Sequence, residues 1–311
     1  MGLPGGPHTV LAAAQGIPVG PAPPPPQEPQ KIRKGEALRT ETEMTLVGAT
    51  VTDPLGRIVT GLEREDFRVF EDGVEQEVTW FSSQDVPVSI GVIFDMSGSM
   101  ADKIERSRQA AVEFFRTANP RDEFFLVNFN NRAQLISQFT ASVDDLQNRL
   151  NDTAARGLTA LYDGVYLGLS QMKGAHNTKK ALLILSDGGD NHSRYSESEV
   201  RRYVQEADVQ IYAIGLFDSE RTPEERAGPS LLYDLTEMTG GRVFTVKNVN
   251  ELPDVATKIS MELRDQYVLG YVPSHRAHDG KWRKIKVKLH PPKGLPPLTV
   301  FAKTGYFAPG H

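Results

Sequence analysis

Apolar runs alternate with amphipathic stretches through the middle of the chain. The runs VSIGVIF, EFFLVNF, KALLILSD and VQIYAIGLF have the length and the aliphatic and aromatic content of buried strands. Between them lie stretches such as KIERSRQAAVEFFRTA and ALYDGVYLGLSQM, whose apolar residues recur with a helical period. Buried strands that alternate with helices are typical of a mostly parallel sheet covered on both faces. The pattern therefore predicts a doubly wound, Rossmann-like α/β domain over residues 86–265.

The segments on either side of this domain have the polar and apolar alternation of antiparallel strands. Residues 40–85 contain FRVFEDGVEQEVTW, in which Asp72-Gly73 separates two alternating runs and so signals a hairpin. Residues 266–311 contain QYVLGYVP, WRKIKVKLH and LTVFAKTGYF. Each flank is too short to form a stable sheet alone. We therefore expect the two flanks to pair into one small β-sandwich, into which the α/β domain is inserted.

Two features of the flanks bear on their packing and charge. Lys284, Lys286 and Lys288 alternate with aliphatic residues in KIKVKL, so one face of this strand is basic. A polyanion site and a solvated strand face both fit this pattern, and the regular alternation favours the solvated face. Trp80 and Trp282 fall on flanking strands, where we expect them to be packing anchors of the sandwich.

The first 39 residues have the composition of a leader and a linker. HTVLAAAQG followed by PAPPPPQEPQ is similar to the end of a signal-peptide apolar core and a proline-rich linker. The opening MGLPGGPH carries no Lys or Arg, which such a signal would have. Two interpretations stay open, a cytosolic leader and an export signal that begins upstream of Met1. We favour export, which predicts a secreted, periplasmic or cell-envelope protein.

Composition narrows the range of functions. The formal net charge of −5 and the pI of about 5.9 give no general indication of nucleic-acid binding. The chain has no cysteine, which excludes thiolate metal sites, disulfides and a cysteine nucleophile, and which fits an oxidising compartment. No apolar run approaches the roughly 20 residues that a transmembrane helix needs.

Hydroxyl and carboxylate side chains follow the predicted buried strands. Asp95 ends the first strand, and its loop supplies Ser97 and Ser99. Asp187 ends a second strand, and Thr159 lies just before a helix. Ligands of open α/β sheets bind at the carboxyl ends of the strands, so we expect these five residues to meet at one edge. Because all the donors are hard oxygens, the set suits Mg²⁺, Mn²⁺ or Ca²⁺ and argues against zinc.

The residues Asp95-Met96-Ser97-Gly98-Ser99, with Thr159 and Asp187, resemble the metal-ion-dependent adhesion site of von Willebrand factor A domains, called I domains in integrins. That site reads Asp-x-Ser-x-Ser, then a separate Thr and a separate Asp. The flanks are similar to a subgroup of bacterial proteins of the acidobacterial VWFA-related type, which is typically exported. The similar pieces are VTDPLGRIVTGLEREDFRVFEDGVEQEVTWF, QYVLGYVP, GKWRKIKVKL and KTGYF.

This resemblance implies a binding role rather than catalysis. It implies that Ser97, Ser99 and Thr159 are direct ligands of a divalent cation, Thr159 mainly when a partner is bound. Asp95 and Asp187 would act largely through coordinated waters. The cation would then capture an acidic group of a protein or matrix partner. In I domains the C-terminal helix shifts when the site is occupied, so a helix at about 249–264 is expected to report the ligand state to the flanks.

Less specific interpretations exist for several of these residues. Ser97 and Ser99 could simply cap the helix that follows them, since Ser is a favoured N-cap residue. Asp163 is interpreted as a solvated or capping carboxylate, and Asp190-Asn191 as a turn. The seven histidines lack ligand spacing such as HExxH, and His192 is expected on the surface.

Two other functions compete with the binding module. The chain could be a constitutive structural subunit of a cell-envelope assembly, in which the metal serves only stability. It could also be an Mg²⁺-dependent phosphohydrolase with Asp95 as the nucleophile. Such phosphatases usually carry a second aspartate two residues further on, where this chain has Ser97. The sequence has neither a GxSxG nor a GxxxxGK[ST] motif around its serines, which also counts against an enzyme.

Overall fold

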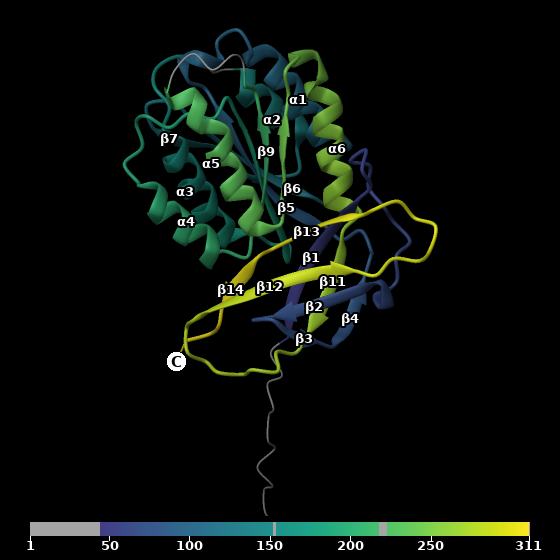
Figure 1. Cartoon of the computed structure of the whole chain (residues 1–311). Helices are drawn as coiled ribbons and strands as arrows, with labels where there is room; N and C mark the ends of the chain where they lie inside the picture. Colours follow the sequence, from purple (N-terminus) through teal and green to yellow (C-terminus); the bar gives the residue numbers. More distant parts are fainter. Residues whose placement is uncertain (1–43, 152–153, 218–222, 311) are drawn as a thin grey trace, which may run out of the picture. The chain divides into compact units, whose positions relative to one another are not determined.

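The computed structural model describes residues 44–151, 154–217 and 223–310 (Figure 1). The chain divides into two units, Met1–Glu41 and Thr42–His311, and the second holds all the described elements. The expected leader and linker, residues 1–39, lie outside the described residues.

The middle of the chain forms an α/β domain with a central six-stranded sheet. The strand order is β10-β9-β8-β5-β6-β7, in which β7 runs antiparallel to β6 and the other pairs are parallel. The strands and helices are β5 (Val88–Asp95), α1 (Ile104–Thr117), β6 (Glu123–Phe129), β7 (Ala133–Thr140), α2 (Val143–Asn151), α3 (Leu161–Gln171), β8 (Lys179–Ser186), α4 (Glu197–Glu206), β9 (Gln210–Gly215), α5 (Pro223–Thr239), β10 (Val243–Thr245) and α6 (Leu252–Arg264).

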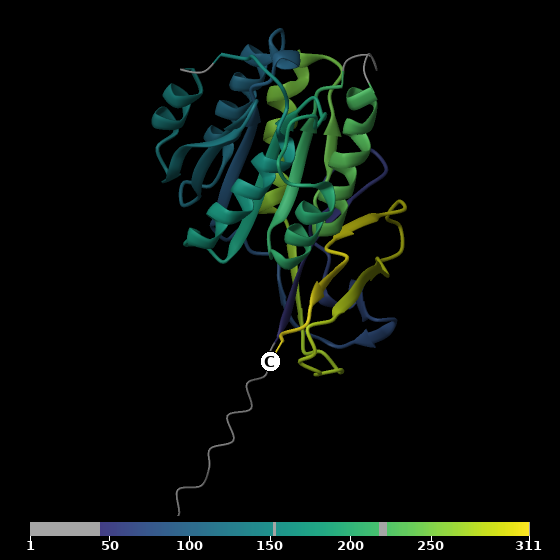
Figure 2. The same ribbon diagram turned by 90° about the vertical axis from the view of Figure 1, so that its left-hand side faces the viewer.

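Helices cover both faces of this sheet, as Figure 2 shows. One apolar core joins the sheet to α1, α2 and α6, and a second joins its other face to α3, α4 and α5. All eight residues of β5 are buried, which fits its position in the middle of the sheet. The doubly wound, mostly parallel fold predicted from the pattern is therefore confirmed.

The two flanks pair with each other in two antiparallel sheets. Their strands are β1 (Thr45–Thr52), β2 (Phe67–Glu71), β3 (Val74–Gln76), β4 (Val78–Ser82), β11 (Tyr267–Tyr271), β12 (Trp282–Leu289), β13 (Thr299–Ala302) and β14 (Gly305–Phe307). One sheet has the order β13-β1-β11-β4 and the other β14-β12-β2-β3, so each contains strands from both flanks. A single apolar core lies between the two sheets. The α/β domain is thus inserted in a small sandwich, as expected.

The aromatic residues of the sandwich core are tyrosine and phenylalanine rather than tryptophan. The Tyr267 ring lies 5.0 Å from the ring of Phe67, and both side chains are buried. Trp80 is 43% exposed, so the prediction that it anchors the core is wrong. Trp282 is only partly buried and packs edge-on against Phe307 at the surface. The alternation along β4 does not reveal which of its two faces meets the core.

The predicted hairpin and the predicted basic strand face are both present. Asp72 and Gly73 adopt φ values of 48° and 85° in the turn between β2 and β3, which is the left-handed geometry of a two-residue hairpin. On β12, Lys284, Lys286 and Lys288 are exposed, while the aliphatic residues between them are buried. The lysines therefore form a solvated strand face.

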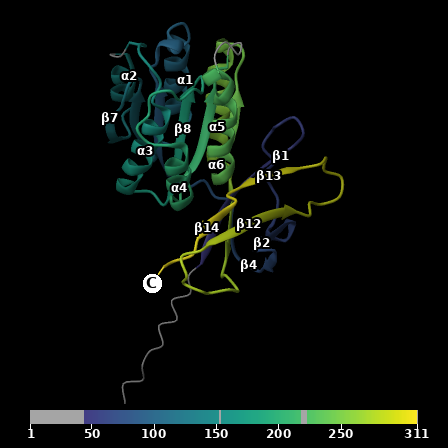
Figure 3. The same ribbon diagram turned by 60° about the vertical axis from the view of Figure 1, so that its left-hand side comes forward.

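The sandwich lies at the end of the α/β domain where the parallel strands begin (Figure 3). Polar side chains join the two there. Gln266, between α6 and β11, donates from Nε2 to Thr50 Oγ1 of β1 at 3.0 Å and to Gln210 Oε1 of β9 at 2.7 Å. Arg242 pairs with buried Glu262 of α6 at 2.6 Å, and burial raises the pKa of Glu262 to about 7. Because Gln210 begins β9, the junction is at the amino edge of the sheet. The carboxyl edge lies at the opposite end.

Candidate metal centre

Asp95 is the last residue of β5, at the centre of the carboxyl edge of the sheet. β5 pairs with β6 on one side and with β8 on the other, so the strand order reverses at β5. Open α/β sheets bind ligands at such a topological switch point, beside the carboxyl ends of the strands. The carboxylate is fully buried. Its Oδ1 accepts the backbone N–H of Ser97 at 2.8 Å, and its Oδ2 accepts the Ser186 hydroxyl at 2.5 Å. Both oxygens are therefore held in fixed directions.

The two serines of the loop after Asp95 bring their hydroxyls together. Ser97 Oγ and Ser99 Oγ lie 3.0 Å apart, with Ser97 buried and Ser99 exposed. A short 3₁₀ turn, Gly98–Met100, follows Ser97, and the Ser97 side chain makes no capping hydrogen bond to it. The residue at the N-cap position of α1 is Lys103. The interpretation of the serines as helix caps therefore does not hold.

Asp187 follows the last residue of β8 and is the second buried carboxylate at this edge. It lies close enough to Asp95 for the two charges to interact. Burial, helped by the negative charge of Asp187, raises the pKa of Asp95 to about 7. The ammonium group of Lys103 lies 3.4 Å from Asp187 Oδ2, and both side chains are buried. Two carboxylates and one ammonium group thus share this edge.

Thr159 is buried in a loop that contacts the loops after β5 and β8. On one side, Gly98 N–H donates to Gly157 O at 3.0 Å and Arg156 N–H donates to Met96 O at 2.8 Å. On the other side, Thr159 N–H donates to Asn191 Oδ1 at 2.9 Å. The backbone carbonyl of Thr159 accepts the N–H groups of residues 191 and 192. The structure therefore places Thr159 between the serine loop and the Asp187 loop, as the sequence predicted.

The remaining polar residues near this edge hold loops together. Asp163 is buried, not solvated, and its Oδ1 accepts the backbone N–H groups of Arg194 and Tyr195. Asp190 Oδ2 accepts the N–H of Tyr162 at 3.0 Å. His192 is exposed, as expected. Asp163 was expected to be a solvated or capping carboxylate. It is not solvated, because the Arg194 loop folds over it, and its hydrogen bonds join that loop to α3 and do not cap a helix.

The donor chemistry and spacing at this edge fit a small divalent cation. Two oxygens at neighbouring positions of an octahedral ion, each at about 2.1 Å from it, lie about 3 Å apart. The Ser97 and Ser99 hydroxyls have this separation. In the described part of the chain, no three His, Asp or Glu side chains gather to hold a metal. A cation here would therefore depend on the hydroxyls as well as on Asp95 and Asp187.

Three residues of this site were not identified from the sequence. Ser186 orients Asp95, Lys103 pairs with Asp187, and Asn131 Oδ1 accepts the N–H of Leu158 beside Thr159 at 2.7 Å. Ser186 could have been noted because it precedes Asp187 at the same strand end. The other two lie at sequence positions that carry no such signal.

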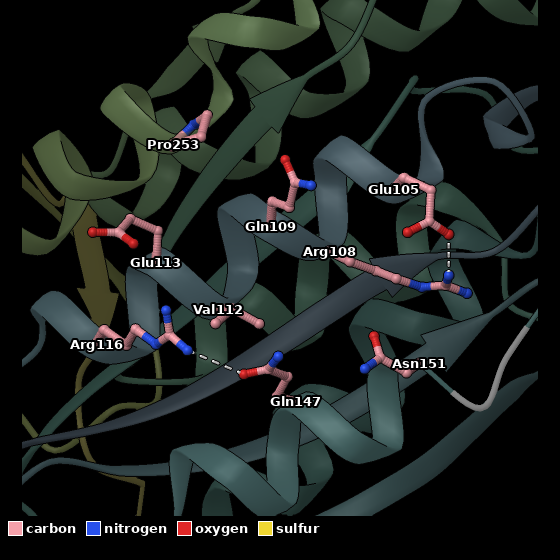
Figure 4. A pocket seen from close by; sticks show the side chains of 9 residues that line it. All are labelled: Glu105, Arg108, Gln109, Val112, Glu113, Arg116, Gln147, Asn151 and Pro253. Carbon is pink, nitrogen blue, oxygen red and sulfur yellow. Dashed lines mark hydrogen bonds and ion pairs between the residues drawn. The ribbon is translucent and has the colours of Figure 1, made fainter.

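A separate surface hollow of about 380 Å³ lies along α1, next to α2 and the start of α6 (Figure 4). Three of its charged side chains have partners, since Arg108 bonds Glu105 at 2.5 Å and Arg116 donates to Gln147 at 3.3 Å. No Ser, Thr, His or Lys lines it. It therefore lacks the hydroxyl donors of the strand-end site.

Comparison with known proteins connects this geometry to one domain family. Residues 90–189 match the family model described as von Willebrand factor type A domain. An uncharacterized protein of Borreliella burgdorferi is 27% identical over 184 residues, which is 51% of this chain and 54% of that protein. The chain thus spans about half the length of this curated relative.

Solved structures show the same fold at low sequence identity. The von Willebrand factor type A protein from Catenulispora acidiphila has a TM-score of 0.51 and 12% identity, over 86% of this chain and 75% of that one. A D319A mutant of the PilB minor pilin from Streptococcus sanguinis has a TM-score of 0.50 and 15% identity, over 59% and 62% of the two chains. Among the described helices, none has both the length and the apolar content of a membrane span.

Proposed function

The chain contains a von Willebrand factor type A domain, and from this premise we propose that it is a non-enzymatic, metal-dependent binding module. The proposed site holds a divalent cation at the carboxyl edge of the sheet. The proposed ligand is an acidic group of a protein or matrix partner. The cation is Mg²⁺, with Mn²⁺ or Ca²⁺ as possible substitutes, since all these ions prefer oxygen donors.

The observation that carries this proposal is the convergence of hydroxyls and carboxylates on one edge. Ser97 and Ser99 would bind the cation directly, and Thr159 would join them when the partner is bound. Asp95 and Asp187 would contribute charge through bound water. With neutral hydroxyls as direct ligands, the cation keeps most of its positive charge, and it supplies a position that favours a carboxylate from outside. The residues of this chain orient that position but carry out no bond-breaking step.

The surroundings of Asp95 favour binding over phosphate-ester hydrolysis. An aspartyl nucleophile must reach its substrate, whereas Asp95 is fully buried and both its oxygens accept hydrogen bonds. The position two residues further on is Ser97 rather than an aspartate. His192 contacts Thr159 through its backbone N–H and is exposed, so its ring is not held in place as a general base.

The proposed cellular location is outside the cytoplasm. The export interpretation of the first 39 residues supports a secreted, periplasmic or cell-envelope protein. The similarity of the flanks to the bacterial VWFA-related subgroup points the same way. The carboxyl edge lies at the opposite end of the α/β domain from the sandwich junction, so the sandwich leaves it accessible to a partner.

Affinity capture from an extract of the source organism tests the proposal. The bait is the full chain, as wild type and as Thr159→Ala, each in Mg²⁺ and in EDTA. We expect a partner that wild type retains in Mg²⁺, that EDTA releases, and that the variant binds at least about 10-fold more weakly. Thr60→Ala, at an exposed threonine far from this edge, serves as the matched control and should behave as wild type.

The same capture separates the competing functions. A partner that is retained in EDTA and by Thr159→Ala would favour the constitutive structural subunit. Turnover of a generic phosphate ester that is lost in Asp95→Ala would favour the hydrolase.

A further inference from the structure

Lys103 carries a positive charge into the proposed metal site. Its Nζ lies 3.4 Å from Asp187 Oδ2, and the two side chains are only 8% and 6% exposed. The start of α1 fixes its backbone, because Lys103 N–H donates to Met100 O and Lys103 O accepts both N–H and Oγ of Ser107. The ammonium group is therefore part of the folded site and not a solvated surface charge.

The two buried carboxylates of the proposed site outnumber the ammonium group beside them. Asp95 and Asp187 are buried, and Ser186, the neighbour of Asp187, donates its hydroxyl to Asp95 Oδ2. When both carboxylates are ionised, Lys103 offsets one of their two negative charges. An unpaired buried carboxylate is costly, so the ammonium group stabilises the site in the absence of a divalent cation. The same ammonium group repels such a cation when it binds.

We propose that Lys103 is a built-in countercharge that lowers the affinity of the site for the divalent cation and raises the affinity of the cation-loaded site for a partner's carboxylate. This inference deepens the proposed function and rests on it. With two carboxylates, one ammonium group and a divalent ion, the loaded site has a net charge of +1, which one carboxylate of the partner neutralises. Without Lys103 the loaded site is already neutral. Lys103 thereby disfavours the cation and favours the carboxylate of the partner.

Charge-removing and charge-keeping substitutions test this role. The full chain is prepared free of metal as wild type, Lys103→Met, Lys103→Gln and Lys103→Arg, and Mn²⁺ binding is measured by calorimetry. We expect the two neutral variants to bind Mn²⁺ about 10-fold more tightly than wild type, because the repulsion is gone. Lys103→Arg should stay within about threefold of wild type because it keeps the charge. Lys286→Met, at an exposed lysine of β12, is the matched control and should bind Mn²⁺ as wild type does.

Thermal melting in EDTA gives a second readout that does not depend on a bound metal. The neutral variants should melt about 5 °C or more below wild type in EDTA and recover in Mn²⁺, because the cation replaces the missing charge. Neutral variants that bind Mn²⁺ no more tightly than wild type, or that fail to fold even in Mn²⁺, would overturn the inference while leaving the proposed function intact. Wild type that takes up no Mn²⁺ would overturn both.

Discussion

Replacing Ser97 and Ser99 together by alanine is expected to abolish Mg²⁺ binding while leaving the fold intact. The two hydroxyls lie 3.0 Å apart and are the neutral direct ligands in the proposed site. Substitutions that touch only the surroundings of a metal typically cost 10- to 100-fold in affinity, so loss of two direct ligands should cost more than about 100-fold. The Ser97 side chain makes no capping hydrogen bond, so the stability change in EDTA should stay near 1 kcal/mol. Calorimetric titration with Mg²⁺ and melting in EDTA measure the two effects.

The chain contains a matched control for this pair. Ser196 and Ser198 are also two residues apart, with hydroxyls 3.1 Å apart, but they lie at the start of α4. Ser196→Ala/Ser198→Ala should keep the Mg²⁺ affinity of wild type and lose only about 1 kcal/mol of stability, because Ser196 caps that helix. Wild-type Mg²⁺ affinity in Ser97→Ala/Ser99→Ala would mean that the cation is bound elsewhere.

Among the glycines that the structure describes, Gly241 is expected to show the largest loss of stability on substitution by alanine. Gly241 lies between α5 and β10, and a Cβ atom there would stand 1.8 Å from the backbone oxygen of Ile211 in β9. The backbone carbonyl of a paired strand cannot turn aside as a flexible side chain can, so β10 must move. We expect a decrease of about 3 kcal/mol or more in the free energy of unfolding. Urea denaturation measures this change.

Gly174→Ala is the control for this substitution. Gly174 is exposed, its φ is not positive, and nothing lies within 4 Å of the position of an added Cβ. The alanine variant should differ from wild type by less than about 1 kcal/mol. A Gly241→Ala protein as stable as the Gly174→Ala protein would show that the chain between α5 and β10 can adjust at little cost.

Local patterns sufficed for much of the fold and for the main residues of the candidate site. The apolar run that ends in Asp95 predicts a central parallel strand, because only such a strand is buried on both faces. Asp72-Gly73 predicts its hairpin because few other residue pairs adopt positive φ at both positions. Carboxyl ends of parallel strands meet at one edge, which is why Asp95 and Asp187 could be expected together.

The features that the sequence did not predict depend on contacts between distant parts of the chain. Lys103 becomes part of the site only because α1 begins beside the end of β8, which no local pattern encodes. Trp80 was expected to be a packing anchor of the sandwich, yet the pairing of β4 with β11 leaves it 43% exposed. Asp163 was expected to be a solvated or capping carboxylate, and the Arg194 loop buries it. In each case, a segment that is distant in sequence decides the surroundings of the residue.

The most direct test of the central claim is a crystal structure of the full chain soaked in Mn²⁺, with the metal located by its anomalous scattering. We predict one strong peak at the carboxyl edge of the sheet, with Ser97 Oγ and Ser99 Oγ among the ligands at about 2.1 Å. Asp95 and Asp187 should lie around it, most of their contacts being made through water. An anomalous map without a peak at this edge, or Mn²⁺ bound there by other residues, would contradict the account.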